Sequence, residues 1–174
     1  MLGSTTYGDG LVGSKRRIWI MLRHLKAALV AFRETSAELV PSSDPVRLAC
    51  AALLTKAGRL DGRLDEAEEA VMLRAMVDRF SLDQATARAV LEEGGDDLET
   101  SSDIYRYTKV LREAFNENER IELLEMLWEV TYVDGTLHEF EAQLMRRLAG
   151  LLYVDDRESG AARKRAMIKL GLAG

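Results

Sequence analysis

Asp134-Gly135-Thr136-Leu137-His138-Glu139-Phe140-Glu141 is the stretch around which the predicted fold is organised. An earlier stretch, Asp61-Gly62-Arg63-Leu64-Asp65-Glu66-Ala67-Glu68, lies 73 positions before it and shares the pattern Asp-Gly-x-Leu-x-Glu-x-Glu. Each stretch lies between two mostly apolar runs whose apolar residues recur at helical spacing. The repetition predicts one helix–turn–helix unit that is used twice, with acidic side chains at matching places.

The likeness extends beyond these two motifs, which favours a repeat over a chance match. Apolar and basic residues recur at the same separation on both sides of the Asp-Gly pairs. The matched positions are Leu54 with Leu127, Leu60 with Val133, Met72 with Met145, Arg74 with Arg147, and Phe80 with Tyr153.

Helix capping explains part of each motif. Gly62 and Gly135 supply the turn at a helix C-terminus, where a positive φ is favourable for glycine. Asp65-x-x-Glu68 has the pattern of a capping box at the start of the next helix, and His138-x-x-Glu141 is a weaker version of that pattern. Capping therefore explains both glutamates without any bound ligand.

Capping does not explain Asp61 and Asp134, because an acid at a helix C-terminus meets the negative end of the macrodipole. A cation shared with the glutamate seven residues further on is one compensation, and water or a neighbouring arginine is another. Carboxylate oxygens suit Ca²⁺ or Mg²⁺, and His138 beside Glu141 also suits Zn²⁺. The spacing excludes an EF-hand, whose glycine stands at position 6 of the loop.

The composition predicts an all-α globular domain. Hydrophobic residues make up 47% of the 174 residues, and proline occurs only at positions 41 and 45, which leaves long stretches free to be helical. No alternating strand pattern occurs, and helical spacing predicts seven or eight helices in a compact bundle. Cys50 is the only cysteine, so an internal disulfide is excluded, and a reducing cytoplasm suits the chain.

The chain divides into three predicted regions. Residues 1–14 are glycine-rich and predict a disordered tail, residues 15–40 predict an amphipathic helix, and residues 44–174 predict the helical domain. Within the domain, Pro45 predicts a helix start, and Gly94-Gly95 predicts a helix end followed by an acidic loop over 96–100. The run from Ile121 to Tyr132 is apolar on most sides and predicts a central buried helix.

Charge is distributed unevenly along the chain. The net charge is −5, but residues 34–154 carry 13 basic and 25 acidic residues, which gives −12 for the body of the chain. Such an acidic body disfavours nucleic acid and suits cations or a basic partner, although surface acid also serves solubility. No apolar run is long enough to span a bilayer, and no export signal is recognised. The basic helix over 15–33 either packs on the protein or contacts an anionic membrane surface.

The pattern of reactive residues does not predict an enzyme. His24 and His138 are the only histidines, and Cys50 lies on an apolar helical stripe, so no nucleophile–base pair is recognised. Trp128 and Tyr132 lie at helical spacing and are predicted to be core residues rather than a platform for stacking bases. No glycine-rich phosphate loop follows a strand.

Two stretches of the sequence resemble the TerB-like tellurite-resistance family of bacterial proteins. They are residues 57–68, which end on the first motif, and residues 122–135, which lead into the second; Ile104-Tyr105-Arg106-Tyr107-Thr108 fits the same branch. The resemblance covers about residues 44–170. It implies an all-helical fold of two related halves, acids that bind divalent cations, and a role in tellurite and other stress resistance. The metal ligands predicted from the motifs and this resemblance together are Asp61, Asp65, Glu68, Asp134, His138 and Glu141.

Two functions follow as expectations. The first is a non-enzymatic, divalent-cation-binding scaffold (Ca²⁺, Mg²⁺ or Zn²⁺) in the bacterial response to tellurite or envelope stress. The second is a metal-independent protein–protein interaction module in the cytoplasm, with peripheral membrane contact through residues 15–33 as an additional expectation.

Overall fold

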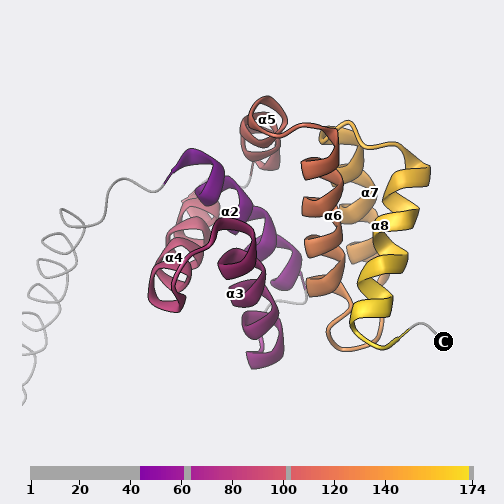
Figure 1. The fold of residues 1–174 in the computed structure, drawn as a ribbon, viewed down its shortest axis with the longest axis horizontal. Helices are drawn as coiled ribbons and strands as arrows, with labels where there is room; N and C mark the ends of the chain where they lie inside the picture. Colours follow the sequence, from indigo (N-terminus) through magenta and orange to yellow (C-terminus); the bar gives the residue numbers. More distant parts are fainter. Residues whose placement is uncertain (1–43, 61–63, 101–102, 173–174) are drawn as a thin grey trace, which may run out of the picture. The chain divides into compact units, whose positions relative to one another are not determined.

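The computed structural model describes residues 44–60, 64–100 and 103–172. These residues form seven α-helices and no strand, which confirms the predicted all-α fold (Figure 1). The predicted tail over 1–14, the predicted helix over 15–40 and the candidate ligand Asp61 lie outside the described residues. The helices are α2 (Pro45–Gly58), α3 (Glu66–Phe80), α4 (Gln84–Thr100), α5 (Ile104–Ala114), α6 (Glu117–Thr131), α7 (Glu139–Leu151) and α8 (Asp156–Lys169).

Side-chain caps fix where several of these helices begin. The Asp44 carboxylate accepts a hydrogen bond from Val46 N at 2.9 Å, and Pro45 occupies the first helical position, as its sequence predicts. Asn116 and Glu119 form a reciprocal capping box at the start of α6. These short-range contacts satisfy backbone donors that a helix leaves unpaired.

The predicted helix end at Gly94-Gly95 is wrong, because α4 continues through both glycines to Thr100 and replaces the predicted acidic loop. Both glycines are buried, and a Cβ on Gly94 would lie 2.8 Å from the backbone N of Ala52. The missing side chain therefore lets α4 approach α2 closely. Packing between the two helices outweighs the low helix propensity of glycine.

The helices of residues 44–172 pack in two sets of three. Helix α2 packs against α3 and α4, α6 packs against α7 and α8, and α5 contacts both α2 and α7 (Figure 1). Contacts of α6 with α2 and α3 join the sets. In each set the first helix packs more extensively against the third than against the second, but α3 also packs against α4 whereas α7 and α8 barely meet, and a duplication of one unit stays a prediction.

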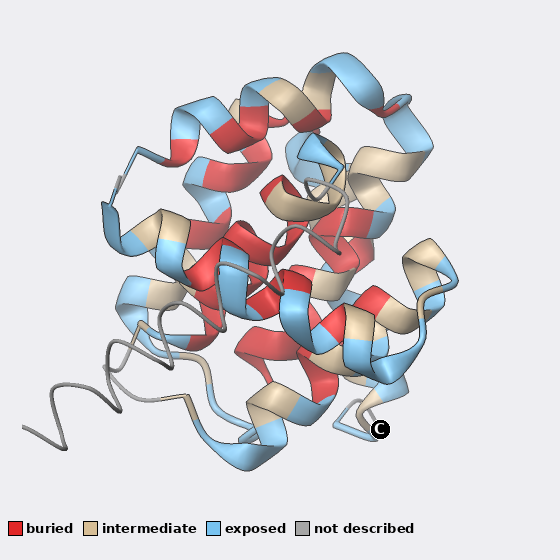
Figure 2. Ribbon diagram, turned by 90° about the vertical axis from the view of Figure 1, so that its left-hand side faces the viewer, coloured by how far each residue is buried: buried red, intermediate tan, exposed pale blue. Residues whose placement is uncertain are grey.

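Helix α6 supplies much of the core that these sets share. Figure 2 shows the buried residues gathered toward the middle of the domain. Eight of its residues are buried, which confirms the predicted central helix, and Trp128 and Tyr132 are core residues as predicted.

Cys50 is fully buried on α2, and burial raises the pKa of its thiol to about 12, so the thiolate is strongly disfavoured. Within the described residues, none of the helices is long and apolar enough to cross a membrane.

Candidate functional site

The described part of the first motif closes the start of α3. The Asp65 carboxylate accepts a hydrogen bond from Glu68 N at 2.8 Å, and Asp65 N donates to Glu68 Oε2 at 2.9 Å. This reciprocal pair confirms the capping box predicted from the sequence. Asp65 is exposed, and Glu68 is half-buried.

The second motif closes its turn and its helix by separate contacts. Thr136 donates to Asp134 twice, from its backbone N at 2.9 Å and from its hydroxyl at 2.8 Å. His138 N donates to Glu141 Oε2 at 2.7 Å, whereas the His138 side chain makes no capping hydrogen bond. Only one half of the weaker capping box predicted here is therefore formed, namely the hydrogen bond that Glu141 accepts from His138 N.

These contacts determine the charge state of Asp134. The hydrogen bond from Thr136 N is the largest cause that holds the pKa of this carboxyl below its usual value, and the Thr136 hydroxyl and the charge of His138 act in the same direction. Asp134 is thus a stable carboxylate at neutral pH. The sequence places Asp134 where the negative end of the helix dipole is unfavourable for an acid. Hydrogen bonds from Thr136, rather than an arginine, offset this interaction.

The ends of α2 and α6 that lead into the motifs lie against each other. A Cβ placed on Gly58 would come within 3.3 Å of Val130 Cγ1 and 2.7 Å of Leu64 Cδ1. Among the described residues, however, no three His, Cys, Asp or Glu side chains come together in a way that could hold a metal ion. The structure therefore does not gather the five described candidate ligands into one cluster, and the metal site that also includes Asp61 stays a prediction.

The fold and the motifs can be compared with known proteins. A family model described as tellurite resistance protein TerB matches residues 47–164, well over half of the chain. The chain belongs to the TerB family. The domain is also similar in fold to the crystal structure of a protein of unknown function, PG1108, from Porphyromonas gingivalis W83. That likeness has a TM-score of 0.50 and 19% sequence identity, and it covers 72% of this chain and 92% of the other. The comparison with curated proteins gave no match.

An ionic network on this TerB domain, built from two buried glutamates and two exposed cations, was not predicted from the sequence. Glu125 and Glu129 on α6 are both buried, and Lys169 Nζ on α8 lies 2.6 Å and 2.9 Å from their carboxylate oxygens. Arg165 Nε also donates to Glu125. The signal in the sequence is a pair of glutamates four residues apart within the mostly apolar second half of α6, matched by cations four residues apart on the last helix.

Opposing effects act on the pKa of Glu125. Burial raises it, but hydrogen bonds and charge from Lys169 and Arg165 outweigh burial and hold the pKa below its usual value. The network borders a cavity of about 310 Å³ between α3 and α6, whose other wall includes Arg74, Asp78 and Arg79. Because its lining carries both charges, this cavity favours no single class of charged ligand.

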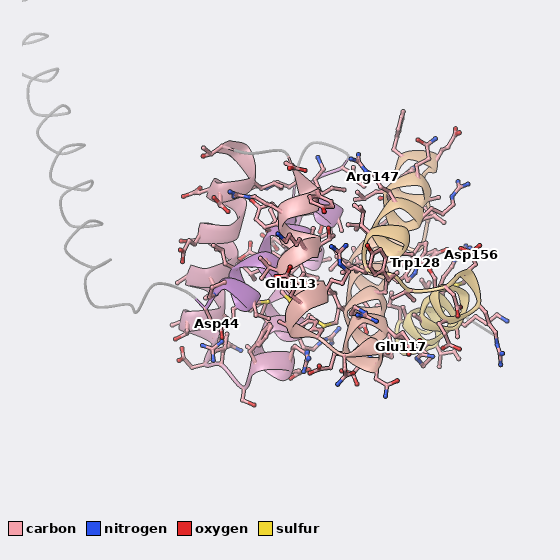
Figure 3. All side chains as sticks on the ribbon, turned by 90° about the horizontal axis from the view of Figure 1, so that it is seen from above. Asp44, Glu113, Glu117, Trp128, Arg147 and Asp156 are labelled. Atoms are coloured by element: carbon pink, nitrogen blue, oxygen red, sulfur yellow. The ribbon has the colours of Figure 1, made fainter. Side chains whose placement is uncertain are left out.

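A second cavity and a cluster of aromatic residues with an arginine complete the candidate features of the TerB domain. A cavity of about 270 Å³ beside the first motif has apolar walls from Leu64 and Met72. On the C-terminal side, the guanidinium of Arg163 lies 5.4 Å from the ring centroids of both Trp128 and Tyr132. Figure 3 shows Trp128 beside α7 and α8. These contacts bind α8 to α6 and leave Trp128 as a sensitive reporter of the packing.

Proposed function

We propose that this TerB-family chain is a non-enzymatic scaffold that folds without a metal ion and acts by binding a protein partner in tellurite or envelope stress. The observation that supports it is the use of the motif acids. Asp65, Glu68 and Glu141 form hydrogen bonds that close the starts of α3 and α7, and Asp134 closes its own turn. Each acid therefore has a structural task that needs no cation.

Survival of bacterial cells in tellurite tests the cellular part of this proposal. Cells that lack the chain should survive less well than cells that carry it, and the Asp134→Asn variant should restore survival as the wild-type chain does. Asparagine keeps an acceptor for Thr136 and removes the charge that a cation needs. Equal survival with and without the chain, or failure of Asp134→Asn to restore survival at normal protein levels, would contradict the proposal.

A divalent-cation site at the two helix breaks is a second candidate. The close approach of Gly58 to Val130 favours it, because this contact brings together the helix ends that lead into Asp61 and Asp134. The ionised carboxylate of Asp134 is a suitable ligand for Ca²⁺ or Mg²⁺, and the neighbouring His138 adds a nitrogen that suits Zn²⁺.

Fluorescence distinguishes the two candidates. Trp128 is followed in a Trp19→Phe background while Ca²⁺, Mg²⁺, Zn²⁺ or Mn²⁺ is added to the full chain. The scaffold predicts no saturable change at millimolar ion. A saturable change that disappears in the Asp61→Asn/Asp134→Asn double variant would establish the cation site.

A further inference from the structure

Arg112 on α5 lies between two exposed tyrosines from different parts of the chain. Its guanidinium carbon is 4.4 Å from the ring centroid of Tyr153, just after α7, and 6.0 Å from that of Tyr105 on α5. Tyr153 is 67% exposed and Tyr105 is 49% exposed, although large hydrophobic residues elsewhere in the domain are mostly buried. We call these three residues the Tyr–Arg–Tyr surface.

The arginine of this surface is held in place without a carboxylate partner. Arg112 Nη1 donates to the backbone oxygen of Leu151 at 3.1 Å, which ties α5 to the end of α7. The other two cations of α5 each lie against a carboxylate, Arg106 against Asp97 and Lys109 near Glu113. Within the described residues, Arg112 is thus a half-buried, fixed cation that has rings and a carbonyl around it but no counter-ion.

The tyrosine that covers this arginine has a backbone conformation that favours glycine. Tyr153 has a φ of +56°, in the left-handed region, where a bulky side chain is an outlier. The turn itself is an ordinary helix end, since Tyr153 N donates to Gly150 O and Val154 N donates to Ala149 O. Closing the helix therefore does not require a tyrosine here, and the ring of Tyr153 lies against Arg112. Strained residues of this kind concentrate at functional positions.

We propose that the Tyr–Arg–Tyr surface binds an acidic segment of a partner protein, with a carboxylate of that segment accepting hydrogen bonds from Arg112. Tyrosine and arginine are the residue types that most often dominate binding energy at protein interfaces. A guanidinium is a planar fork of N–H groups that fits a carboxylate, and among the described residues Arg112 donates a hydrogen bond only from Nη1. This proposal rests on the scaffold function above and names the chemistry of its partner.

The Tyr–Arg–Tyr surface lies on an acidic protein. Residues 34–154 carry a net charge of −12, so an acidic segment is repelled from most of the domain and is favoured where an unpaired cation is fixed. Other described cations, such as Arg47 and Arg147, also lack an ion pair, and Arg112 differs from them in lying against two exposed tyrosines.

NMR titration of the ¹⁵N-labelled full chain tests the proposal. The probe is a short, acetylated and amidated peptide of glutamate residues with one central leucine, and its control carries glutamine in place of every glutamate. We expect the glutamate peptide to shift the resonances of Tyr105, Arg112 and Tyr153, and the glutamine peptide to bind at least about tenfold more weakly.

Three variants separate binding from folding. Arg112→Lys keeps the charge but loses the fork, and should weaken binding about tenfold. Tyr153→Gly removes the ring while giving the turn its preferred residue, so binding should fall about tenfold with no loss in the unfolding midpoint. Phe140→Ala is the matched control, because Phe140 is a 75% exposed aromatic residue at the opposite end of α7, and binding should be unchanged.

Several results would overturn the proposal. Equal binding of the two peptides would show that the carboxylate is not what is recognised. Wild-type affinity in Arg112→Lys and Tyr153→Gly would show that the Tyr–Arg–Tyr surface is not the binding site. Binding to phosphatidylglycerol vesicles without binding to the peptide would replace a protein partner by a membrane. Peptide shifts confined to other residues would overturn this surface while leaving the scaffold function intact.

Discussion

Gly94 on α4 packs directly against Ala51 on α2, so closely that a Cβ on Gly94 would lie 2.8 Å from the Ala51 Cβ. This contact explains why a residue with low helix propensity occupies the middle of α4. It also holds α4 against α2 in the set formed by α2, α3 and α4.

Substituting Gly94 by alanine should destabilise the domain even though alanine is the better helix former. The new methyl group would meet the Ala52 backbone N at 2.8 Å, and overpacking of this kind lowers the free energy of unfolding by about 1–3 kcal/mol. Gly160→Ala is the matched control, since Gly160 lies inside α8 with no atom near its Cβ position. The control should gain about 0.5–1 kcal/mol. Urea unfolding measures both, and a stabilised Gly94→Ala variant would contradict the close packing.

The Glu125 network should make stability depend on pH. The folded pKa of Glu125 lies below its ordinary value of 4.5, so its contribution is present above that value and is lost as the pH falls through the folded pKa. Glu125→Gln should lower the free energy of unfolding by about 1–2 kcal/mol at neutral pH and make it less sensitive to acid. Unfolding curves recorded at several acidic pH values check this.

Glu113→Gln is the comparison for this network. Glu113 lies 3.9 Å from Lys109 in an exposed pair, which is expected to contribute less than about 0.5 kcal/mol. A loss as large as that of Glu125→Gln would show that general charge, rather than the buried network, sets the stability.

Thr136 should control the ionisation of Asp134. Thr136→Val keeps the backbone donor and removes the hydroxyl donor, so the pKa of Asp134 should rise toward its ordinary value while staying below it. Carboxyl ¹³C NMR titration measures this shift. Thr86→Val provides the control, because Thr86 makes the same two contacts to Asp83 and should leave the titration of Asp134 unchanged.

Two left-handed positions should respond to substitution in opposite directions. Gly135 has a φ of +82°, and Gly135→Ala should lower the free energy of unfolding by about 1 kcal/mol. Ser81 has a φ of +51° at the end of α3, so Ser81→Gly should raise stability by a smaller amount, because relief of the strain exceeds the added entropy of the unfolded chain. Thermal unfolding of both variants tests this pair, and a loss in both would contradict it.

Local signals in the sequence predicted the parts of the fold that depend on local contacts. Asp65 is recognisable as a cap from the sequence because the group it bonds lies three residues away. The continuation of α4 through Gly94 was missed because it depends on α2, more than forty positions earlier. A glycine pair predicts a helix end only when no neighbouring helix packs closely against the two glycines.

The candidate site was less predictable for the same reason. The sequence indicates that Glu68 and Glu141 can cap their helices, and the structure confirms both contacts. It gives no indication that Arg112 lies against Tyr153, because those residues meet only through the packing of α5 against the end of α7. The shared cation site, which needs Asp61, stays a prediction.

Thermal unfolding of the full chain in EDTA and in millimolar Ca²⁺, Mg²⁺, Zn²⁺ or Mn²⁺ tests the metal-independent fold most directly. We predict the same midpoint in every solution, because the described motif acids already close their own helix ends. An ion present at a hundred times its Kd would add about 2.7 kcal/mol, which is a rise of roughly 5–10 °C for a chain of this size. A rise of that size in the wild-type chain, absent from Asp134→Asn, would contradict the account.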